Sequence, residues 1–173
     1  MLVRVLGVAL DPEQEHVILL KPVASPDDRI LPVWIGAQEA TSILIAVQGA
    51  DSPRPLAHDV MLSMLDALDG EVSRVEVTRV EDGTFFAAVT LDTVAGERVI
   101  DARPSDAIAL ASRAGAPIFV ADDVLDAAGI PDTISDTPEV DDTVVPEPAE
   151  VQEERVEQFR RFLDEIEPED FQG

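Results

Sequence analysis

The sequence predicts an α+β fold assembled from two halves, each of which runs through three strands and then one helix. Two patterns indicate this order: turn residues separate apolar runs rich in β-branched residues, and the last run of each half leads into apolar residues at helical spacing. With 173 residues, of which 46% are hydrophobic, the chain suffices for one well-buried core and is short for two. We therefore expect a mixed or antiparallel sheet with helices packed on it, followed by an acidic C-terminal tail with one short amphipathic helix.

The first half combines a hairpin, a third strand and a helix. Turn residues at 11–15 separate the first two apolar runs. The third run leads into Gly36, after which apolar residues recur at helical spacing until Gly49 supplies a stop. The three strands are expected at residues 2–10, 16–21 and 30–35.

The second half repeats that order after a rigid connector. Prolines within residues 51–55 fix their own φ angles and favour extended geometry, and a helix is expected at 56–68. A turn at 81–84 then separates two β-branched runs, and Pro104 opens a helix that Gly115 closes. The strands of this half are expected at 72–80, 85–91 and 98–102, and a short strand at 117–120 and a short helix at 122–128 follow them.

The chain is predicted to divide into a domain of residues 1–129, a linker of residues 130–150 and a tail of residues 151–173. The linker is rich in Pro, Asp, Glu and Thr and lacks apolar periodicity, so it is expected to be disordered. The tail carries a helical apolar stripe, and so short a helix is marginal in water without a surface to cover it. We therefore expect the tail helix to bind a protein partner or a neighbouring subunit. The stripe consists of Val156, Phe159, Leu163 and Ile166.

The charge distribution is strongly acidic and concentrated toward the C-terminus. The formal net charge is −24, with 9 Lys and Arg against 18 Asp and Glu in residues 1–121, and 3 against 18 in residues 122–173. Such a surface repels phosphates and lacks the extended basic footprint of most nucleic-acid-binding proteins. Arginines set locally among carboxylates, or a bound divalent ion, would be needed to reverse the sign at a phosphate site.

Two classes of protein are excluded by composition. The chain has no cysteine, which rules out a disulfide framework, a thiolate metal site and a cysteine nucleophile. Its apolar stretches never approach the ~18 to 20 residues that cross a bilayer, and its start lacks the pattern of a signal peptide. We therefore expect a cytoplasmic protein that does not bind membranes.

The first candidate for chemistry is the segment from Pro53 to Asp59. Prolines flank Arg54 at the start of a predicted helix, where free N–H groups and the helix dipole favour a phosphate. One turn into that helix, His58 and Asp59 are placed to act as base or metal ligand. The alternative interpretation is that Asp59 stabilises the helix N-terminus and that His58 has no chemical role.

The second candidate is the segment from Asp101 to Asp106. Asp101 ends a predicted strand and Asp106 lies in the first turn of a predicted helix, so their carboxylates can converge on one hard divalent ion such as Mg²⁺ or Mn²⁺. Glu39 occupies the equivalent helix-start position in the first half and is the third candidate ligand. The alternative is a structural role, with Asp106 at the helix start and Arg103 paired to Asp101 or Asp59.

Aromatic residues provide a weaker signal for nucleic-acid binding. Phe85 and Phe86 alternate across a strand, so only one of them needs to face the core, and Phe86 is the candidate platform for stacking a base. Trp34, in the strand before Gly36, is expected to be packed.

Four ordered motifs make the sequence resemble the bifunctional nuclease domain family over about residues 1–128. The resemblance implies an α+β fold, hydrolysis of both DNA and RNA, and self-association into a homo-oligomer. The sequence departs from the usual pattern at Ala57, where a hydroxyl residue commonly precedes His-Asp, and at Phe86, where a tyrosine is common. The motifs occupy residues 31–40, 54–59, 83–87 and 101–110.

The leading hypothesis is a metal-assisted phosphodiester hydrolase. The metal ligands would be Asp101, Asp106 and Glu39, Arg54 and Arg103 would bind the phosphate, and His58 with Asp59 would transfer protons; the catalytic set is therefore His58, Asp59, Asp101 and Asp106. Two alternatives stay open at this point. The same arginines and carboxylates suit a regulatory module that binds an anionic ligand or a partner protein without hydrolysis, and they also suit turns held by structural salt bridges.

Overall fold

The computed structural model describes residues 1–24, 29–50 and 52–132, and Met1–Asp132 forms one compact unit. The predicted linker beyond residue 132 and the predicted tail helix lie outside the described residues. No helix in the described part of the chain is long and apolar enough to cross a membrane.

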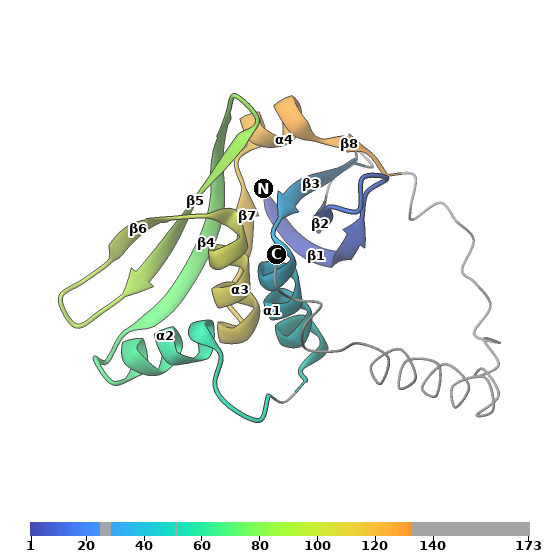
Figure 1. The fold of residues 1–173 in the computed structure, drawn as a ribbon. Coiled ribbons are helices and arrows are strands. Elements are labelled where there is room, and N and C mark those ends of the chain that lie inside the picture. Colours follow the sequence, from blue (N-terminus) through green and yellow to red (C-terminus); the bar gives the residue numbers. More distant parts are fainter. Residues whose placement is uncertain (25–28, 51, 133–173) are drawn as a thin grey trace, which may run out of the picture. The chain divides into compact units, whose positions relative to one another are not determined.

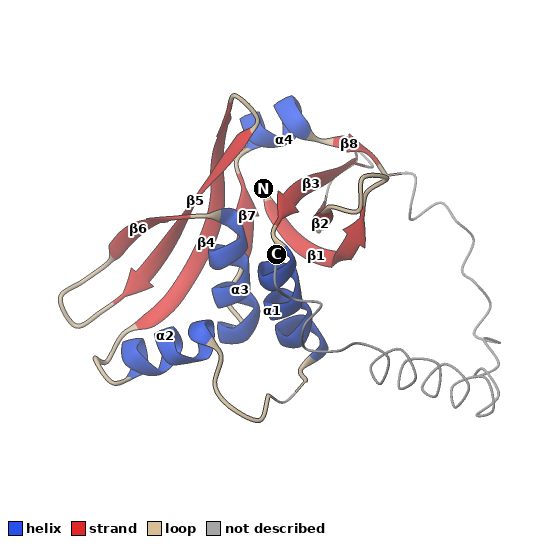
Figure 2. Ribbon diagram, in the orientation of Figure 1, coloured by secondary structure: helices blue, strands red, loops and turns tan. Residues whose placement is uncertain are grey.

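Each half contains three strands and then a helix, as the sequence predicts (Figures 1 and 2). The first half consists of β1 (Leu2–Leu10), β2 (His16–Pro22), β3 (Arg29–Ile35) and α1 (Ala37–Gln48). Helix α2 (Ala57–Asp66) joins it to the second half, which consists of β4 (Glu71–Glu81), β5 (Thr84–Asp92), β6 (Arg98–Ala102) and α3 (Pro104–Ala114). The last described elements are β7 (Ile118–Val120), α4 (Asp122–Ala128) and β8 (Ile130–Pro131).

The strands form a mixed sheet in the order β6-β5-β4-β7-β1-β2-β3-β8. Strand β7 lies between the two three-stranded halves, antiparallel to β1 and parallel to β4. The other pairs of the described sheet are antiparallel; hairpins or short connections join all of them except β3 and β8, which are distant in the chain. The two halves therefore lie on either side of β7, and the predicted α+β fold with helices packed on the sheet is confirmed.

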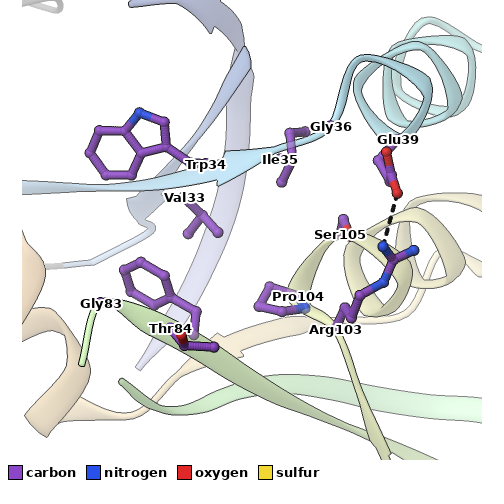
Figure 3. Close-up of a pocket in the computed structure, with 11 residues that line it drawn as sticks. Val33, Trp34, Ile35, Gly36, Glu39, Gly83, Thr84, Arg103, Pro104 and Ser105 are labelled. Atoms are coloured by element: carbon purple, nitrogen blue, oxygen red, sulfur yellow. Dashed lines mark ion pairs between the residues drawn. The ribbon is translucent and has the colours of Figure 1, made fainter. Parts of the chain in front are cut away.

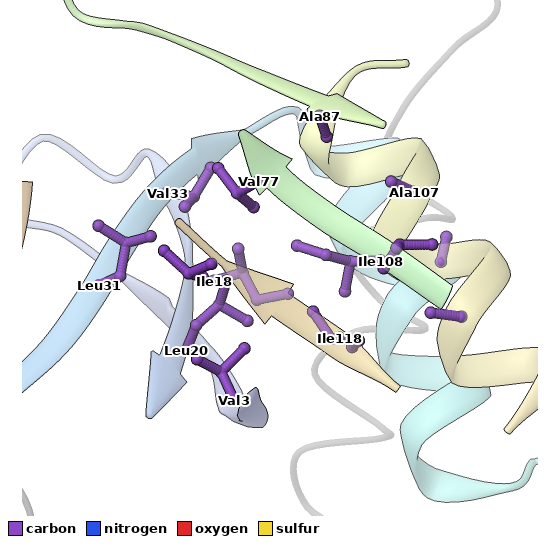
Figure 4. Packing of buried hydrophobic residues seen from close by; sticks show 14 of the residues in the cluster. Val3, Ile18, Leu20, Leu31, Val33, Val77, Ala87, Ala107, Ile108 and Ile118 are labelled. Atoms are coloured by element: carbon purple, nitrogen blue, oxygen red, sulfur yellow. The ribbon is translucent and has the colours of Figure 1, made fainter. Parts of the chain in front are cut away.

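The core is filled mainly by branched aliphatic side chains of the strands and by alanines of α3. Buried residues alternate along most of β4 and along the second part of β2, which is the pattern of strands with one covered face. Helix α3 buries Ala107, Ile108, Ala109 and Ala111, so that small side chains let its backbone approach β4 and β5 closely (Figure 4). Burying each larger aliphatic side chain contributes ~1.5 to 3 kcal/mol, so this cluster dominates the stability of the domain.

Helices α1 and α3 begin and end in the same way and lie side by side (Figure 1). The residue before each helix is extended, with φ −73° and ψ 160° at Gly36 and φ −70° and ψ 146° at Arg103. Each helix ends at a glycine in the left-handed region, with φ 61° at Gly49 and 68° at Gly115, where other residues would be strained. The packing of α1 on α3 places their first turns next to each other.

The compact unit extends three residues past the expected boundary at residue 129. Ile130 and Pro131 pair with the start of β3, and the buried Asp132 carboxylate accepts a hydrogen bond from the Lys21 ammonium. The sequence did not reveal this extension because the partner strand lies about 100 residues earlier in the chain.

Two truncations test where the stable domain ends. Deleting residues 133–173 is expected to leave the free energy of unfolding nearly unchanged, because the sequence of the linker lacks apolar periodicity and the tail helix is expected to bind a partner. Deleting residues 130–173 also removes β8 and the carboxylate that binds Lys21, and is expected to cost about 3 kcal/mol more. Urea unfolding of both truncated proteins and of the full chain measures the difference. Equal stability of the two truncated proteins would contradict a structural role for Asp132.

Candidate functional site

A chain of polar side chains joins α1, α2 and α3 where their first turns meet. Its centre is His58 of α2, whose side chain is 9% exposed. The Nδ1 atom of His58 lies 3.0 Å from Ser42 Oγ of α1, and Nε2 lies 3.2 Å from Asp106 Oδ1 of α3. One imidazole therefore bridges the helices of the two halves.

The partners of His58 indicate which ring nitrogen carries the hydrogen. An ionised Asp106 can only accept, so Nε2–H donates to it. Ser42 Oγ accepts a hydrogen bond from Arg113 Nη2 at 3.1 Å, and its own hydroxyl hydrogen is free to donate to Nδ1. Every donor then has an acceptor, so we assign a hydrogen to Nε2 of His58.

Arg103 connects the carboxylates of the two halves. Its Nε and Nη2 donate to both oxygens of Asp106, at 2.7 and 3.1 Å, and its Nη1 lies 3.0 Å from Glu39 Oε1. This pairing raises the pKa of Arg103, with the hydrogen bonds to Asp106 as the largest cause. The Arg103 side chain is 65% exposed, so an incoming anion can reach the guanidinium without disturbing the core.

Asp106 is held ionised by its neighbours. Partial burial of the carboxyl acts to raise its pKa, but the hydrogen bonds from Arg103 and then His58 outweigh it and lower the pKa below the ordinary value for Asp. Asp106 therefore presents a carboxylate, fixed on both sides, at the beginning of α3.

Gly36 makes room for the carboxylate of Glu39. A Cβ atom at Gly36 would lie 2.3 Å from Glu39 Oε2, so any larger residue would displace the end of that side chain. The glycine after β3 thus allows Glu39 to fold back over the start of α1, toward Arg103 (Figure 3).

Arg113 and Ser42 belong to this network although the sequence did not single them out. Arg113 is buried, and it donates to Asp59 Oδ1 at 2.8 Å, to Ser42 Oγ and to the carbonyl of Ala109. The available signal was that Asp106 and Arg113 are seven residues apart, which places two charged groups on one face of a largely apolar helix. Their partners on α1 and α2 are set only by the packing of the helices.

Two cavities meet at Arg103 and Glu39. The larger, about 640 Å³, is lined by His58 and Asp106 and by apolar side chains that include Ile45 and Met61. The smaller, about 350 Å³, lies between the end of β3, the β4–β5 turn and the start of α3 (Figure 3). Both contain Glu39 and Arg103 in their walls, so the guanidinium separates the two spaces.

The structure brings together four of the predicted site residues and places the others elsewhere. Glu39, His58, Arg103 and Asp106 form one cluster. Arg54 and Asp59 line a different cavity of about 440 Å³, where Asp59 binds Arg113 and accepts a hydrogen bond from the Leu56 N–H at 2.7 Å. Asp59 thus stabilises the start of α2, which is the alternative role that the sequence allowed.

The remaining two predicted residues lie on the β5–β6 hairpin. Asp101 is exposed on β6, opposite Ala88, and no hydrogen bond or ion pair among the described residues joins it to the cluster. Phe86 lies on β5 with the Arg79 guanidinium 3.7 Å from its ring centre, so a cation already covers one face of the ring.

The described residues do not fit the expected metal site. No group of three or more His, Cys, Asp or Glu side chains in the described ranges is placed to hold an ion. Glu39 and Asp106 are close, but the Arg103 guanidinium already binds both carboxylates, and Asp101 is not joined to them. A divalent ion at this place would have to displace Arg103 first.

Comparison with known proteins identifies the family. The family model described as the bifunctional nuclease domain matches residues 18–133, which include the whole cluster around His58. The chain belongs to the bifunctional nuclease domain family. The resemblance carried by the four sequence motifs is thereby confirmed.

The chain is similar to relatives of two kinds. An uncharacterised protein of Mycobacterium tuberculosis is 38% identical over 171 residues, covering 99% of this chain and 98% of that protein. A protein of rice, Oryza sativa, named bifunctional nuclease 1 is 27% identical over 64% of this chain, and one of the same name from Arabidopsis thaliana is 34% identical over 53%. These matches span only 34% and 29% of the two plant proteins.

The pKa of Asp59 leads to a prediction for stability in acid. The Leu56 N–H and then Arg113 lower this pKa, against the opposing effect of burial, so the folded value lies below the ~3.9 of an unfolded Asp. A lowered folded pKa stabilises the protein above about pH 4, and the contribution is lost as the pH falls through the folded value. We expect Asp59→Asn to cost about 1 to 3 kcal/mol at pH 7 and to flatten the loss of stability below pH 4.

Urea unfolding between pH 2.5 and 7 measures both effects. Asp66→Asn is the matched control, because Asp66 is an exposed carboxylate near the other end of α2. Parallel pH profiles for wild type and Asp59→Asn would contradict the role of the Asp59–Arg113 pair.

Proposed function

We propose that this protein hydrolyses phosphodiester bonds in DNA and RNA at the cluster around Arg103. The observation that carries the proposal is an exposed guanidinium bound to an ionised Asp106, at the junction of two cavities, in a chain of the bifunctional nuclease domain family. The names of the two plant relatives support the choice of substrate.

Arg103 is the group that would bind the phosphate. A guanidinium offers parallel N–H donors that match two oxygens of a phosphate, and such charge-assisted hydrogen bonds are short and strong. The same donors neutralise the charge that develops on the phosphoryl oxygens during attack by water. In the protein without substrate, Asp106 and Glu39 accept these donors.

Asp106 is the group that would take the proton from the attacking water. When the Arg103 guanidinium turns from Asp106 to the phosphate, the carboxylate loses a hydrogen bond that lowers its pKa and becomes a stronger base. The oxygen of water then bonds to phosphorus while its proton goes to Asp106, the bond from phosphorus to the leaving oxygen breaks, and Asp106 returns the proton to that oxygen. The hydroxyl group of water thus ends on the phosphate, and its proton ends on the leaving oxygen.

His58 acts in this proposal as a positioning residue. Its Nε2–H keeps the Asp106 carboxylate oriented while Arg103 moves, and Ser42 fixes the ring from the other side. The imidazole is buried, which suits a group that holds a carboxylate better than a group that meets solvent. Asp59, expected to share proton transfer with His58, lies in the other cavity.

Single substitutions distinguish the contribution of the cluster to activity from that of the carboxylate on β6. Asp106→Asn keeps the shape of the side chain but removes the base, and is expected to lower kcat on single-stranded DNA and RNA by about 10²- to 10⁴-fold. Asp101→Asn is expected to reduce kcat by a factor at least ten times smaller than the factor for Asp106→Asn, because Asp101 is outside the cluster. Purified full-length variants are assayed in parallel, with thermal melting to show that each is folded.

Two outcomes contradict the assignment. Equal cleavage by wild type and Asp106→Asn would indicate a contaminating nuclease or another site. Saturable binding of oligonucleotide by the wild type without any cleavage would favour the alternative, in which the cluster binds an anionic ligand without hydrolysis.

The requirement for a divalent ion stays a prediction of the sequence, and the proposed steps do not depend on it. The measurement is cleavage after treatment with EDTA, followed by addition of Mg²⁺ or Mn²⁺. Loss of activity that either ion restores would confirm the predicted cofactor, which Glu39 and Asp106 would hold if Arg103 turned away. Unchanged activity would show that the protein side chains suffice.

A further inference from the structure

The smaller of the two cavities has the composition of a pocket for a flat, partly polar ring. Its walls include Val33, Phe85 and Trp34, and hydroxyl groups come from Thr84 and Ser105. The volume is about 350 Å³. Figure 3 shows Trp34 and Val33 on opposite sides of β3, with Arg103 at the start of α3, so the cavity has an aromatic residue at its rim and a cation in its wall.

Trp34 is exposed but held in place. The sequence predicts a packed tryptophan, and the structure corrects this, because 52% of the residue is exposed at the end of β3. The indole Nε1–H donates to Asp11 Oδ2 at 2.9 Å, and this hydrogen bond is the largest cause of the lowered pKa of Asp11. An exposed aromatic ring that is already ordered can stack on a ligand at little entropic cost.

Ser105 presents an unpaired hydroxyl to the same cavity. The residue is only 6% exposed, and its Oγ makes no hydrogen bond to any atom of the described residues. Because Ser105 Oγ is not fully enclosed, it is open to the cavity and free to form a hydrogen bond with a ligand. A polar ring edge would supply the partner for this hydrogen bond.

We propose that this cavity binds one nucleobase of a single-stranded nucleic acid whose phosphate lies at Arg103, an inference that rests on the proposed function. The base stacks at Trp34, and its polar edge bonds to Ser105. A base inside a duplex has no free face for such stacking, so the substrate is unpaired at this position.

The two cavities on either side of Arg103 define the smallest substrate. A phosphodiester bound by the guanidinium carries one nucleoside in each direction, and a separate space is available for each. The larger cavity contains Asp106 and has Ile45, Leu56 and Met61 as apolar contacts for the second nucleoside. Two nucleosides joined by one phosphate therefore fill the site, whereas a mononucleotide fills half of it.

The charge of the protein favours recognition through bases. A net charge of −24 provides no long track of cations along which a phosphate backbone could bind. One arginine with stacking on either side provides affinity that is less sensitive to salt, because base stacking does not release counterions.

The single tryptophan provides a direct measurement. The chain has one Trp and no Tyr, so emission excited at 295 nm comes from Trp34 alone. The full-length protein is titrated with a dinucleoside monophosphate, with a mononucleotide, and with two analogues of the dinucleoside. Each analogue lacks one of the two bases. We expect the dinucleoside to quench Trp34, and we expect removal of the base that occupies the smaller cavity to weaken binding by roughly 5- to 150-fold.

Substitutions at Ser105 test the hydroxyl. Ser105→Ala is expected to weaken binding by about 2- to 10-fold and to raise KM more than it lowers kcat, which is the signature of a lost substrate contact. Ser112→Ala is the matched control, because Ser112 lies two turns further along α3 and lines a different cavity. Phe85→Leu is a second variant. It removes the aromatic ring from the wall of the cavity and keeps an apolar side chain that can pack against the core.

The outcomes distinguish this inference from the proposed hydrolysis. Quenching of Trp34 that depends on the base and on Ser105, without cleavage, supports the nucleobase site and overturns the proposed activity. Cleavage with no quenching, equal affinity for the analogues and a wild-type KM in Ser105→Ala supports the activity and overturns the nucleobase site. Absence of both binding and cleavage overturns both.

Discussion

The close packing of α1 against α3 is the interaction on which the rest of the structure depends. These helices end the two halves of the domain, and buried small residues on both, such as Ala40 and Ala107, allow their backbones to approach. Each helix follows an extended residue at the end of the third strand of its half, and the packing of the helices brings their first turns together. Glu39 and Asp106 therefore come within reach of a single guanidinium.

Arg103 does more for geometry than for stability. An ion pair whose cation is largely exposed contributes little to folding, since solvent screens it and side-chain entropy opposes it. The buried end of the network is different, because Arg113 is enclosed and donates to three acceptors. The network is thus rigid at its buried end and open to exchange at Arg103, which suits a site that must release a carboxylate when an anion binds.

The acidity of the chain and its proposed substrate are compatible because the site is local. The carboxylates of Glu39 and Asp106 offset the charge of the Arg103 guanidinium until a phosphate displaces them. Affinity must then come from contacts beside the phosphate, and the cavities on both sides of Arg103 provide the space for them. In the proposed site, Asp106 carries out the chemistry, whereas the two cavities bind the groups on either side of the phosphate.

The sequence by itself determined the elements of the domain, their order and the family. Strand alternation, turn residues and the glycines after each helix are local signals, so the strands and helices of both halves could be assigned without knowledge of their partners. The same local reasoning found Glu39, His58, Arg103 and Asp106, because each lies in a short motif at a helix start.

Only the tertiary structure decided which of the candidates lie together. It grouped these four, added Ser42 and Arg113, and placed Asp59 and Arg54 in another cavity and Asp101 on β6. It also showed Trp34 exposed and extended the domain to Asp132 through pairing with a distant strand. The physical reason is that spacing along a chain fixes which residues share a helix face, whereas contacts between elements depend on how helices pack, and that packing is set by the whole core.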